Sequence, residues 1–268
     1  MRGPMERRRF LAASIATTAA ALARTGAAQP APAGKREYYQ LRRYSLIRGA
    51  ELQLTQNYFK DALIPAATRM GLGPIGAFSL DIGPETPTYY LLIPGTSLET
   101  LVNLDPLLAR DEEFLKVAAP YWDATAAAPA YQRIETSLLA AFEGWPRITP
   151  PASSATKAKR IFQLRSYESP SNGEHVRKLE MFPGGEYQIF NDVGFRPLFY
   201  GDMLMGPRMP NMTYMLSFDN IDELYTKWDT EMNGAAWKAL STSKRYGFDP
   251  IVDVVSNQVL SPLDCSQI

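Results

Sequence analysis

Two kinds of hydrophobic pattern alternate along the chain. Residues 38–44 alternate as in a β-strand, with Tyr38, Gln40, Arg42 and Tyr44 on one side and Tyr39, Leu41 and Arg43 on the other. In residues 50–70 the apolar positions return with helical spacing, since Leu52, Phe59 and Leu63 fall close to one face. Pro65 is expected to kink this helix, because proline lacks the backbone N–H and clashes with the preceding turn.

Further elements complete the first half of the chain. Strands are predicted over residues 75–82, 88–93 and 131–139, and a Gly-Pro-x-x-Pro turn joins the first two. Ser97 is expected to cap a second helix, and Asp105 and Asp111 to begin shorter helical pieces. The resulting order is β-α-β-β-α-β, which is the ferredoxin-like pattern.

The second half shows the same order of elements. A strand from residue 161 precedes a helix over 173–193, which the Pro-Gly-Gly sequence at 183–185 is expected to break. Strands over 195–205 and 212–218 follow. A helix beginning at 219–222 and a last strand over 251–260 complete the copy.

The two halves therefore look like copies of one module. At a constant shift of 123 positions Arg42 falls on Arg165, and the strand 38–44 falls on 161–167. The same shift superposes Glu51 on Glu174, Phe59 on Phe182, Gly71 on Gly194, Leu101 on Leu224, and residues 83–87 on 206–210. A register kept over this length indicates a duplicated domain.

The duplication predicts an α+β fold. A four-stranded ferredoxin-like sheet carries helices on one face only, so its other face needs cover. We expect the two copies to supply that cover by packing sheet to sheet, as tandem ferredoxin-like repeats forming an intrachain dimeric α/β barrel. The predicted domains are repeat 1 over 37–143, a Pro- and Ser-rich linker over 144–159, and repeat 2 over 160–268.

The polarity of the strands suggests which side faces the helices. We assign Leu41, Phe162 and Leu164 to the helix side. The space between the sheets is then lined by the pairs Gln40/Gln163, Arg42/Arg165 and Tyr44/Tyr167. Polarity alone leaves the opposite assignment open.

The first 28 residues have the parts of an export signal. Basic residues 7–9 precede an apolar run over 10–23 and the small residues 26–28. The run is shorter than the about 20 residues that span a bilayer, so we expect removal and no stable membrane span. Arg7-Arg8-Arg9-Phe10-Leu11 resembles the twin-arginine motif, although an ordinary secretory signal also fits. The predicted location is periplasmic or secreted, with 29–36 as a disordered Pro/Ala spacer.

Charge and motifs exclude several classes of function. Without residues 1–28 the chain has 23 Lys and Arg against 27 Asp and Glu, which gives no basic surface for nucleic acid. The single cysteine, Cys265, permits no intrachain disulfide. The sequence has no Gly-rich phosphate loop, no G-x-S-x-G and no H-E-x-x-H. We therefore predict no cofactor and no metal site.

The second half resembles the NIPSNAP family. The resemblance is carried by residues 161–167, by 174–178 (Glu-His-Val-Arg-Lys), by Gly201 with 206–216, and by 265–268 (Cys-Ser-Gln-Ile). It covers about residues 160–268, and residues 37–142 more weakly through the repeat. It implies a dimeric α/β-barrel fold, without implying a particular reaction. The Pro-Gly-Gly interruption departs from the regular helix that the resemblance implies.

His175, the only histidine, is the candidate catalytic residue. The resemblance implies a ligand cavity between its helix and the sheet, where Arg165, Tyr167 and Arg208 are further ligand-binding candidates. A structural histidine on the helix side is the alternative, because one histidine completes neither a metal triad nor a proton relay.

The two repeated arginines have two interpretations of their own. Arg42 and Arg165 could bind an anionic substrate, or they could pair with carboxylates such as Glu168, Asp202 or Asp253. Arg208 falls in a turn, where a solvated loop residue is the alternative to a position at a cavity mouth.

Two functional hypotheses follow, and the sequence does not decide whether the protein is an enzyme. The first is an exported NIPSNAP-type protein that binds a small apolar or aromatic molecule, or another protein, and that could form a homo-oligomer. The second is a cofactor-independent or haem-using oxygenase with His175 or Arg165 acting in the cavity, which rests on analogy between folds.

Overall fold

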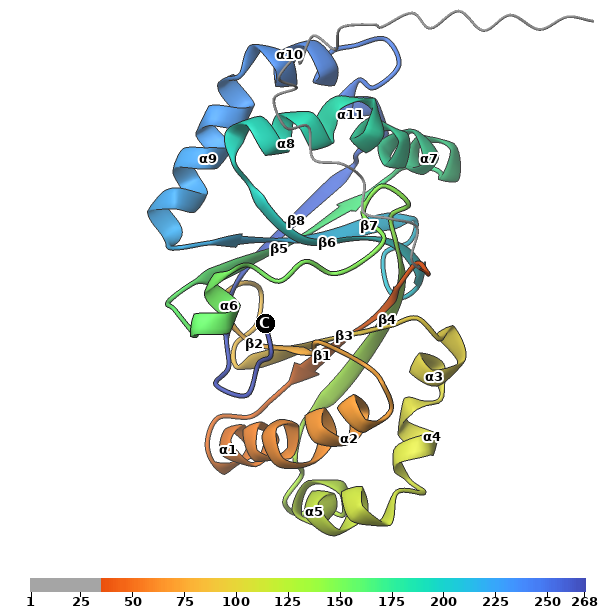
Figure 1. The fold of residues 1–268 in the computed structure, drawn as a ribbon, viewed down its shortest axis with the longest axis vertical. Coiled ribbons are helices and arrows are strands. Elements are labelled where there is room, and N and C mark those ends of the chain that lie inside the picture. Colours follow the sequence, from red (N-terminus) through yellow and green to blue (C-terminus); the bar gives the residue numbers. More distant parts are fainter. Residues whose placement is uncertain (1–34) are drawn as a thin grey trace, which may run out of the picture. The chain divides into compact units, whose positions relative to one another are not determined.

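Eight antiparallel strands close into one barrel in the computed structural model, which describes residues 35–268 (Figure 1). The strands are β1 (Tyr38–Ser45), β2 (Gly76–Ile82), β3 (Thr88–Gly95), β4 (Arg133–Ala141), β5 (Ile161–Glu168), β6 (Arg196–Met205), β7 (Asn211–Phe218) and β8 (Val254–Pro262). The predicted export signal, 1–28, and residues 29–34 of the predicted spacer lie outside the described residues. Arg36, the last residue of that spacer, donates a hydrogen bond to the carbonyl of Ala141 and is therefore held in place.

The strand order confirms the predicted fold class. Around the barrel it reads β1-β3-β2-β8-β5-β7-β6-β4, so each half contributes a ferredoxin-like sheet, β4-β1-β3-β2 and β8-β5-β7-β6. Two seams join the sheets, β2 with β8 and β4 with β6. Tandem ferredoxin-like repeats thus form an α+β intrachain barrel.

Helices cover the outside of each half-barrel (Figure 1). The first half carries α1 (Ala50–Asn57), α2 (Ile64–Arg69), α3 (Leu98–Val102), α4 (Leu104–Leu108) and α5 (Glu112–Trp122). The second carries α7 (Asn172–Met181), α8 (Tyr187–Val193), α9 (Ile221–Asn233), α10 (Ala235–Ser241) and α11 (Phe248–Ile251), and α6 (Ser153–Thr156) lies in the linker. Ser97 and Asp111 cap α3 and α5 as expected.

Both long helices contain a π-helical segment at the same place in the repeat. Tyr58–Leu63 links α1 to α2, and Phe182–Glu186 links α7 to α8. The second segment covers 183–185, where a break was predicted, and Gly185 within it has a non-helical φ of +153°. The first segment ends at Leu63, and Pro65 itself lies in α2. A π turn is wider than an α turn, and such turns are frequent at functional sites.

The structure reverses the predicted assignment of strand faces. Leu41, Phe162 and Leu164 pack together inside the barrel, in one cluster with residues of both halves. Tyr44 packs beneath the helices of the first half, and Tyr167 beneath those of the second. Both sheets cover the middle of the lumen, which therefore takes apolar side chains, aromatic ones included, while Arg42, Tyr44, Arg165 and Tyr167 lie under the helices.

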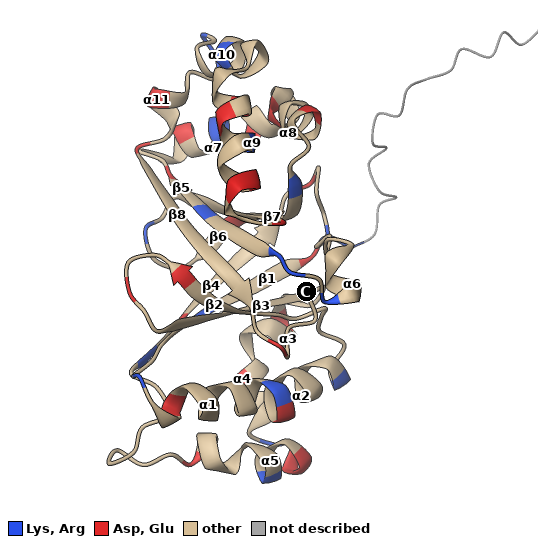
Figure 2. Ribbon diagram, turned by 90° about the vertical axis from the view of Figure 1, so that its left-hand side faces the viewer, with Lys and Arg blue, Asp and Glu red and all other residues tan. Residues whose placement is uncertain are grey.

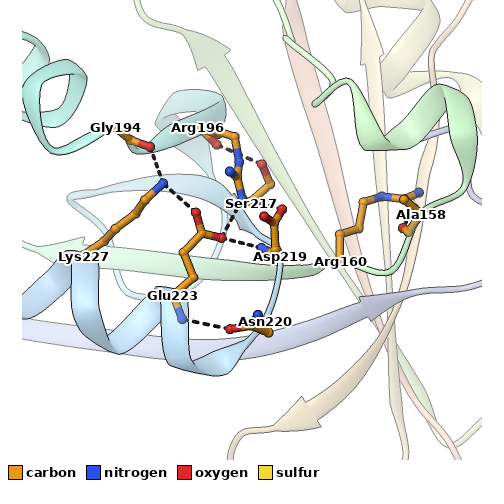
Figure 3. Close-up of polar contacts among 9 residues, drawn as sticks. All are labelled: Ala158, Arg160, Gly194, Arg196, Ser217, Asp219, Asn220, Glu223 and Lys227. Carbon is orange, nitrogen blue, oxygen red and sulfur yellow. Dashed lines mark hydrogen bonds and ion pairs between the residues drawn. The ribbon is translucent and has the colours of Figure 1, made fainter.

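The start of α9 shows how the sequence sets one boundary (Figure 3). The side chain of Asn220 accepts a hydrogen bond from the backbone N–H of Glu223 at 2.9 Å. Glu223 in turn accepts from Arg196 at 2.7 Å and pairs with Lys227 at 2.8 Å. Although burial acts to raise the pKa of Glu223, these hydrogen bonds hold that pKa below its usual value.

Asn220→Ala is expected to lower the free energy of unfolding by about 1 kcal/mol, because the N–H of Glu223 loses its partner. Chemical denaturation followed by circular dichroism measures this change. Asn220→Asp keeps an acceptor and is the matched control, expected to stay close to the parent. Equal losses in both variants would contradict the capping role.

Charged residues of both signs occur on the helices of each half (Figure 2). Among residues 35–268, no helix is both long enough and apolar enough to cross a membrane.

Candidate functional site

A cavity of about 460 Å³ opens between the sheet and the helices of the first half. We call it the tyrosine pocket. Strands β1 and β4, the helices and the loop before β4 supply its lining, which is Arg42, Tyr44, Tyr58, Asp105, Tyr121, Trp122, Ala124, Thr125, Ala126, Pro129, Ala130, Tyr131 and Ile134. It lies where the resemblance implied a ligand cavity, but in the first copy of the module.

Arg42 places a charge at the base of the tyrosine pocket. Only 4% of this residue is exposed, because it points from β1 toward the helices. Its Nε donates to Gln40 at 2.7 Å, and its NH2 group pairs with Asp105 at 2.9 Å. Burial acts to lower the pKa of Arg42, but Tyr44 and Asp105 raise it overall, so the guanidinium stays charged.

Three phenols surround the guanidinium. The rings of Tyr58 and Tyr121 are stacked, with centroids 3.9 Å apart and planes 1° from parallel. Burial raises the pKa of Tyr44, Tyr58 and Tyr121. All three therefore remain protonated near neutral pH.

The hydroxyl of Tyr121 is buried in the wall of this pocket without a hydrogen-bond partner. A buried polar group without a partner destabilises the fold by about 1–3 kcal/mol, so such groups call for an explanation. An acceptor atom of a ligand would satisfy it. The pocket thus combines aromatic faces with a charged guanidinium and a hydroxyl that is buried in its wall without a partner.

At two buried positions of the repeat, the second half carries charged side chains where the first half does not. The 123-residue shift places Lys178 at the position of Thr55 and Glu186 at that of Leu63. The Lys178 Nζ donates to Glu186 at 2.6 Å, and both side chains are almost fully buried. The same ammonium lies 4.9 Å from the ring centroid of Tyr167, the counterpart of Tyr44.

Burial acts on every ionisable group of this cluster. It lowers the pKa of Lys178 and raises that of Glu186, while their mutual attraction opposes both changes. It also raises the pKa of Glu231 to about 7, helped by the charge of Glu186. One carboxylate oxygen of Glu231 is buried without a partner.

Of the four residues predicted for a site, the structure brings Arg165 and Tyr167 together. Arg165 donates to the Tyr167 hydroxyl at 3.0 Å and lies 3.9 Å above the ring of Trp228. The Tyr167 hydroxyl also bonds that of Tyr214 at 2.7 Å. Arg42 pairs with a carboxylate, Asp105, as one of the two interpretations expected, whereas Arg165 bonds a phenol. Neither arginine pairs with Glu168, Asp202 or Asp253, so the named partners were wrong.

His175 and Arg208 lie elsewhere. The Nε2 of His175 bonds Asp202 at 2.8 Å, which ties α7 to β6. His175 lines neither the tyrosine pocket nor the cavity at the barrel mouth described below. Arg208 belongs to that second cavity, where it donates to Ser256 at 3.2 Å. Within residues 35–268, no three His, Cys, Asp or Glu side chains converge as a metal site would require.

Sequence reasoning missed Tyr58, Asp105 and Tyr121, the other polar residues of the tyrosine pocket. The repeat differs nearby, because Thr55 and Leu63, which are buried but do not line the pocket, align with Lys178 and Glu186 of the other copy. Such a difference at buried positions marks where two copies of one module diverge.

Comparisons with known proteins support the fold. The chain matches no protein-family model, and no curated protein matches it significantly in sequence. Among solved structures it is similar to a candidate monooxygenase from Lactobacillus acidophilus, at 10% identity and TM-score 0.54 over 85% of this chain and 94% of that one. An anthrone oxidase-like protein gives 10% identity and TM-score 0.53 over 85% and 92%.

NIPSNAP proteins are also among the structural neighbours. A NIPSNAP-like domain protein from Burkholderia xenovorans is 16% identical over 39% of this chain and 86% of that one, with TM-score 0.36. The closed barrel and the likeness to the monooxygenase-type structures give the chain the fold of the dimeric α/β barrels, with both copies of the module in one polypeptide.

Proposed function

We propose that the protein binds a small aromatic molecule carrying an acceptor oxygen, such as an aromatic ketone, in the tyrosine pocket. The unpartnered hydroxyl of Tyr121 in the pocket wall is the observation that carries this proposal. The stacked rings of Tyr58 and Tyr121 offer an apolar face for the ligand's rings. The export signal expected in residues 1–28 would place this binding outside the cytoplasm.

The charge of Arg42 defines the ligand further. Because Asp105 and Gln40 already engage the guanidinium, a full anion would have to compete with a carboxylate. A neutral carbonyl oxygen can accept a hydrogen bond from an N–H group of Arg42 that also bonds Asp105 or Gln40. It therefore need not displace either partner. This favours a ketone or quinone oxygen over a carboxylate.

An oxygenase acting on such a ligand is the second candidate. Anthrone is a tricyclic aromatic ketone, so the name of the anthrone oxidase-like neighbour agrees with the ligand class that the pocket favours. Asp105 is the one carboxylate of the pocket wall and could accept a proton from a bound substrate. His175, the earlier candidate, bonds Asp202 instead and does not line this pocket.

Tyr121→Phe is expected to weaken binding of 9-fluorenone about tenfold, because it deletes one hydrogen bond worth about 1.4 kcal/mol and leaves the ring stack. Isothermal titration calorimetry on the purified chain measures the affinity. Fluorene, which has the same rings without the oxygen, should bind the parent and the variant equally.

Tyr187→Phe is the matched control, since this hydroxyl is also buried without a partner but belongs to the second half. It should leave fluorenone affinity unchanged. Equal binding of fluorenone by the parent and by Tyr121→Phe would contradict the proposal. Loss of anthrone turnover in Asp105→Asn, with binding retained, would favour the oxygenase over simple binding.

A further inference from the structure

The barrel lumen is packed at one end and hollow at the other. Ile148 and Ile268 belong to the apolar cluster inside the barrel and lie toward the end where β1 and β5 begin. At the opposite end, where β1 and β5 finish, a cavity of about 470 Å³ opens, which we call the mouth cavity. Eight strands enclose an interior just wide enough for side chains to fill it or for one small ligand.

The inward-facing residues of the strands change from apolar to polar toward the mouth cavity. Along β5 the inward side chains run from Phe162 and Leu164 to Ser166 and Glu168, and along β7 from Met215 to Thr213. The hydroxyls of Ser166 and Thr213 bond each other at 2.7 Å. Aliphatic side chains at these positions would fill the lumen and stabilise the barrel more, so the polar lining requires another explanation.

The charged side chains of the mouth cavity differ in how closely they are paired. Arg43 is held between two carboxylates, Glu85 at 2.5 Å and Glu135 at 2.7 Å. Glu168 has a weaker partner, Arg208, at 3.5 Å. Three carboxylates against two guanidinium groups leave one net negative charge in the lining.

Two acceptors of the lining lack a close partner. Glu168 retains acceptor capacity beyond its 3.5 Å contact, and the Oε1 of Gln258 is buried in the cavity wall without a partner. Arg43 cannot take up an anion without giving up a carboxylate. A ligand that supplies donors and a positive charge would satisfy both acceptors, whereas an anion would satisfy neither.

The loop that carries Arg208 supports a built site. Arg208 has a φ of +60°, which is unusual for a residue other than glycine. Asn211 holds this conformation by donating to the carbonyls of Pro207 at 3.1 Å and Arg208 at 3.0 Å. Strained backbone of this kind persists where the surrounding structure fixes it, often beside a ligand.

We propose that the mouth cavity binds a small hydroxylated organic cation, an amino alcohol or amino sugar, with its ammonium group on Glu168 and Gln258. The hydroxyls of Ser166 and Thr213 then face the ligand's hydroxyls. This site is separate from the tyrosine pocket and shares no lining residue with it.

The test is calorimetric titration of the full chain with three sugars that differ in charge. Glucosamine is expected to bind at least tenfold more tightly than glucose, and glucuronate is expected not to bind. Glu168→Gln, which keeps the shape and removes the charge, should weaken glucosamine binding about tenfold and leave any glucose binding unchanged. Gln258→Leu should weaken it as well.

Two controls separate this site from the proposed function. Tyr121→Phe should leave glucosamine binding unchanged, and Glu168→Gln should leave fluorenone binding unchanged. If glucosamine and ethanolamine both fail to bind the parent chain, or if Glu168→Gln binds glucosamine as the parent does, the inference is wrong. Tighter binding of glucose or glucuronate than of glucosamine would overturn it equally.

Discussion

Lys178→Met is expected to lower the free energy of unfolding by about 3–5 kcal/mol, the largest loss that we predict for a single substitution. The variant leaves the Glu186 carboxylate buried without the ammonium that now lies 2.6 Å away. Methionine has a similar length and no charge, so the loss measures the uncompensated carboxylate rather than an empty cavity. Urea denaturation followed by tryptophan fluorescence measures it.

The double variant Lys178→Met/Glu186→Leu is the decisive comparison. Replacing both partners of a buried ion pair by apolar residues of similar volume is often neutral or stabilising, so the double variant should regain most of the loss. The first half shows that the fold accepts uncharged residues here, because Thr55 and Leu63 occupy the equivalent positions. A double variant as unstable as the single one would mean that the pair itself stabilises the fold.

The second large effect is a fall in stability with rising pH, caused by Glu231. Burial raises its folded-state pKa to about 7, from an ordinary value of 4.5, with Glu186 adding to the rise and Arg165 and Lys178 opposing it. A raised folded pKa means that the carboxyl stabilises the fold fully below about pH 4.5, and that this contribution is lost as the pH rises through about 7. The difference corresponds to about 3 kcal/mol.

Glu231→Gln should remove this part of the pH dependence. The variant is expected to match the parent near pH 4 and to exceed its free energy of unfolding by up to about 3 kcal/mol at pH 8. Urea titrations at a series of pH values between 4 and 8 test the prediction. Glu223→Gln is the contrasting control, because the lowered pKa of Glu223 makes its contribution fade as the pH falls. Parallel profiles for the parent and Glu231→Gln would contradict the assignment.

The repeat explains why so much of the barrel could be predicted. A shift of 123 aligned each strand with its copy, and alternation in residues 38–44 and 161–167 located the central strands. Faces were harder to assign, since Arg42 and Arg165 look like residues of a polar interior. They lie instead beneath amphipathic helices, where phenols and amides accept their hydrogen bonds. The polarity of the residues along one strand does not show which face of that strand the helices cover and which face lines the barrel.

The tyrosine pocket could be predicted only in part. Arg42 and Tyr44 stand out because both copies preserve them. Tyr121 comes from a helix 77 positions after Tyr44, and nothing local relates the two residues.

The two seams that join the half-barrels have an evolutionary consequence. In a dimer of identical chains, every mutation appears twice, so a change that closes one pocket closes both. Here β2 pairs with β8 and β4 with β6 within one polypeptide, so each copy can change while its twin stays as it was. The first copy carries the tyrosine pocket, whereas the second carries the buried Lys178–Glu186 ion pair.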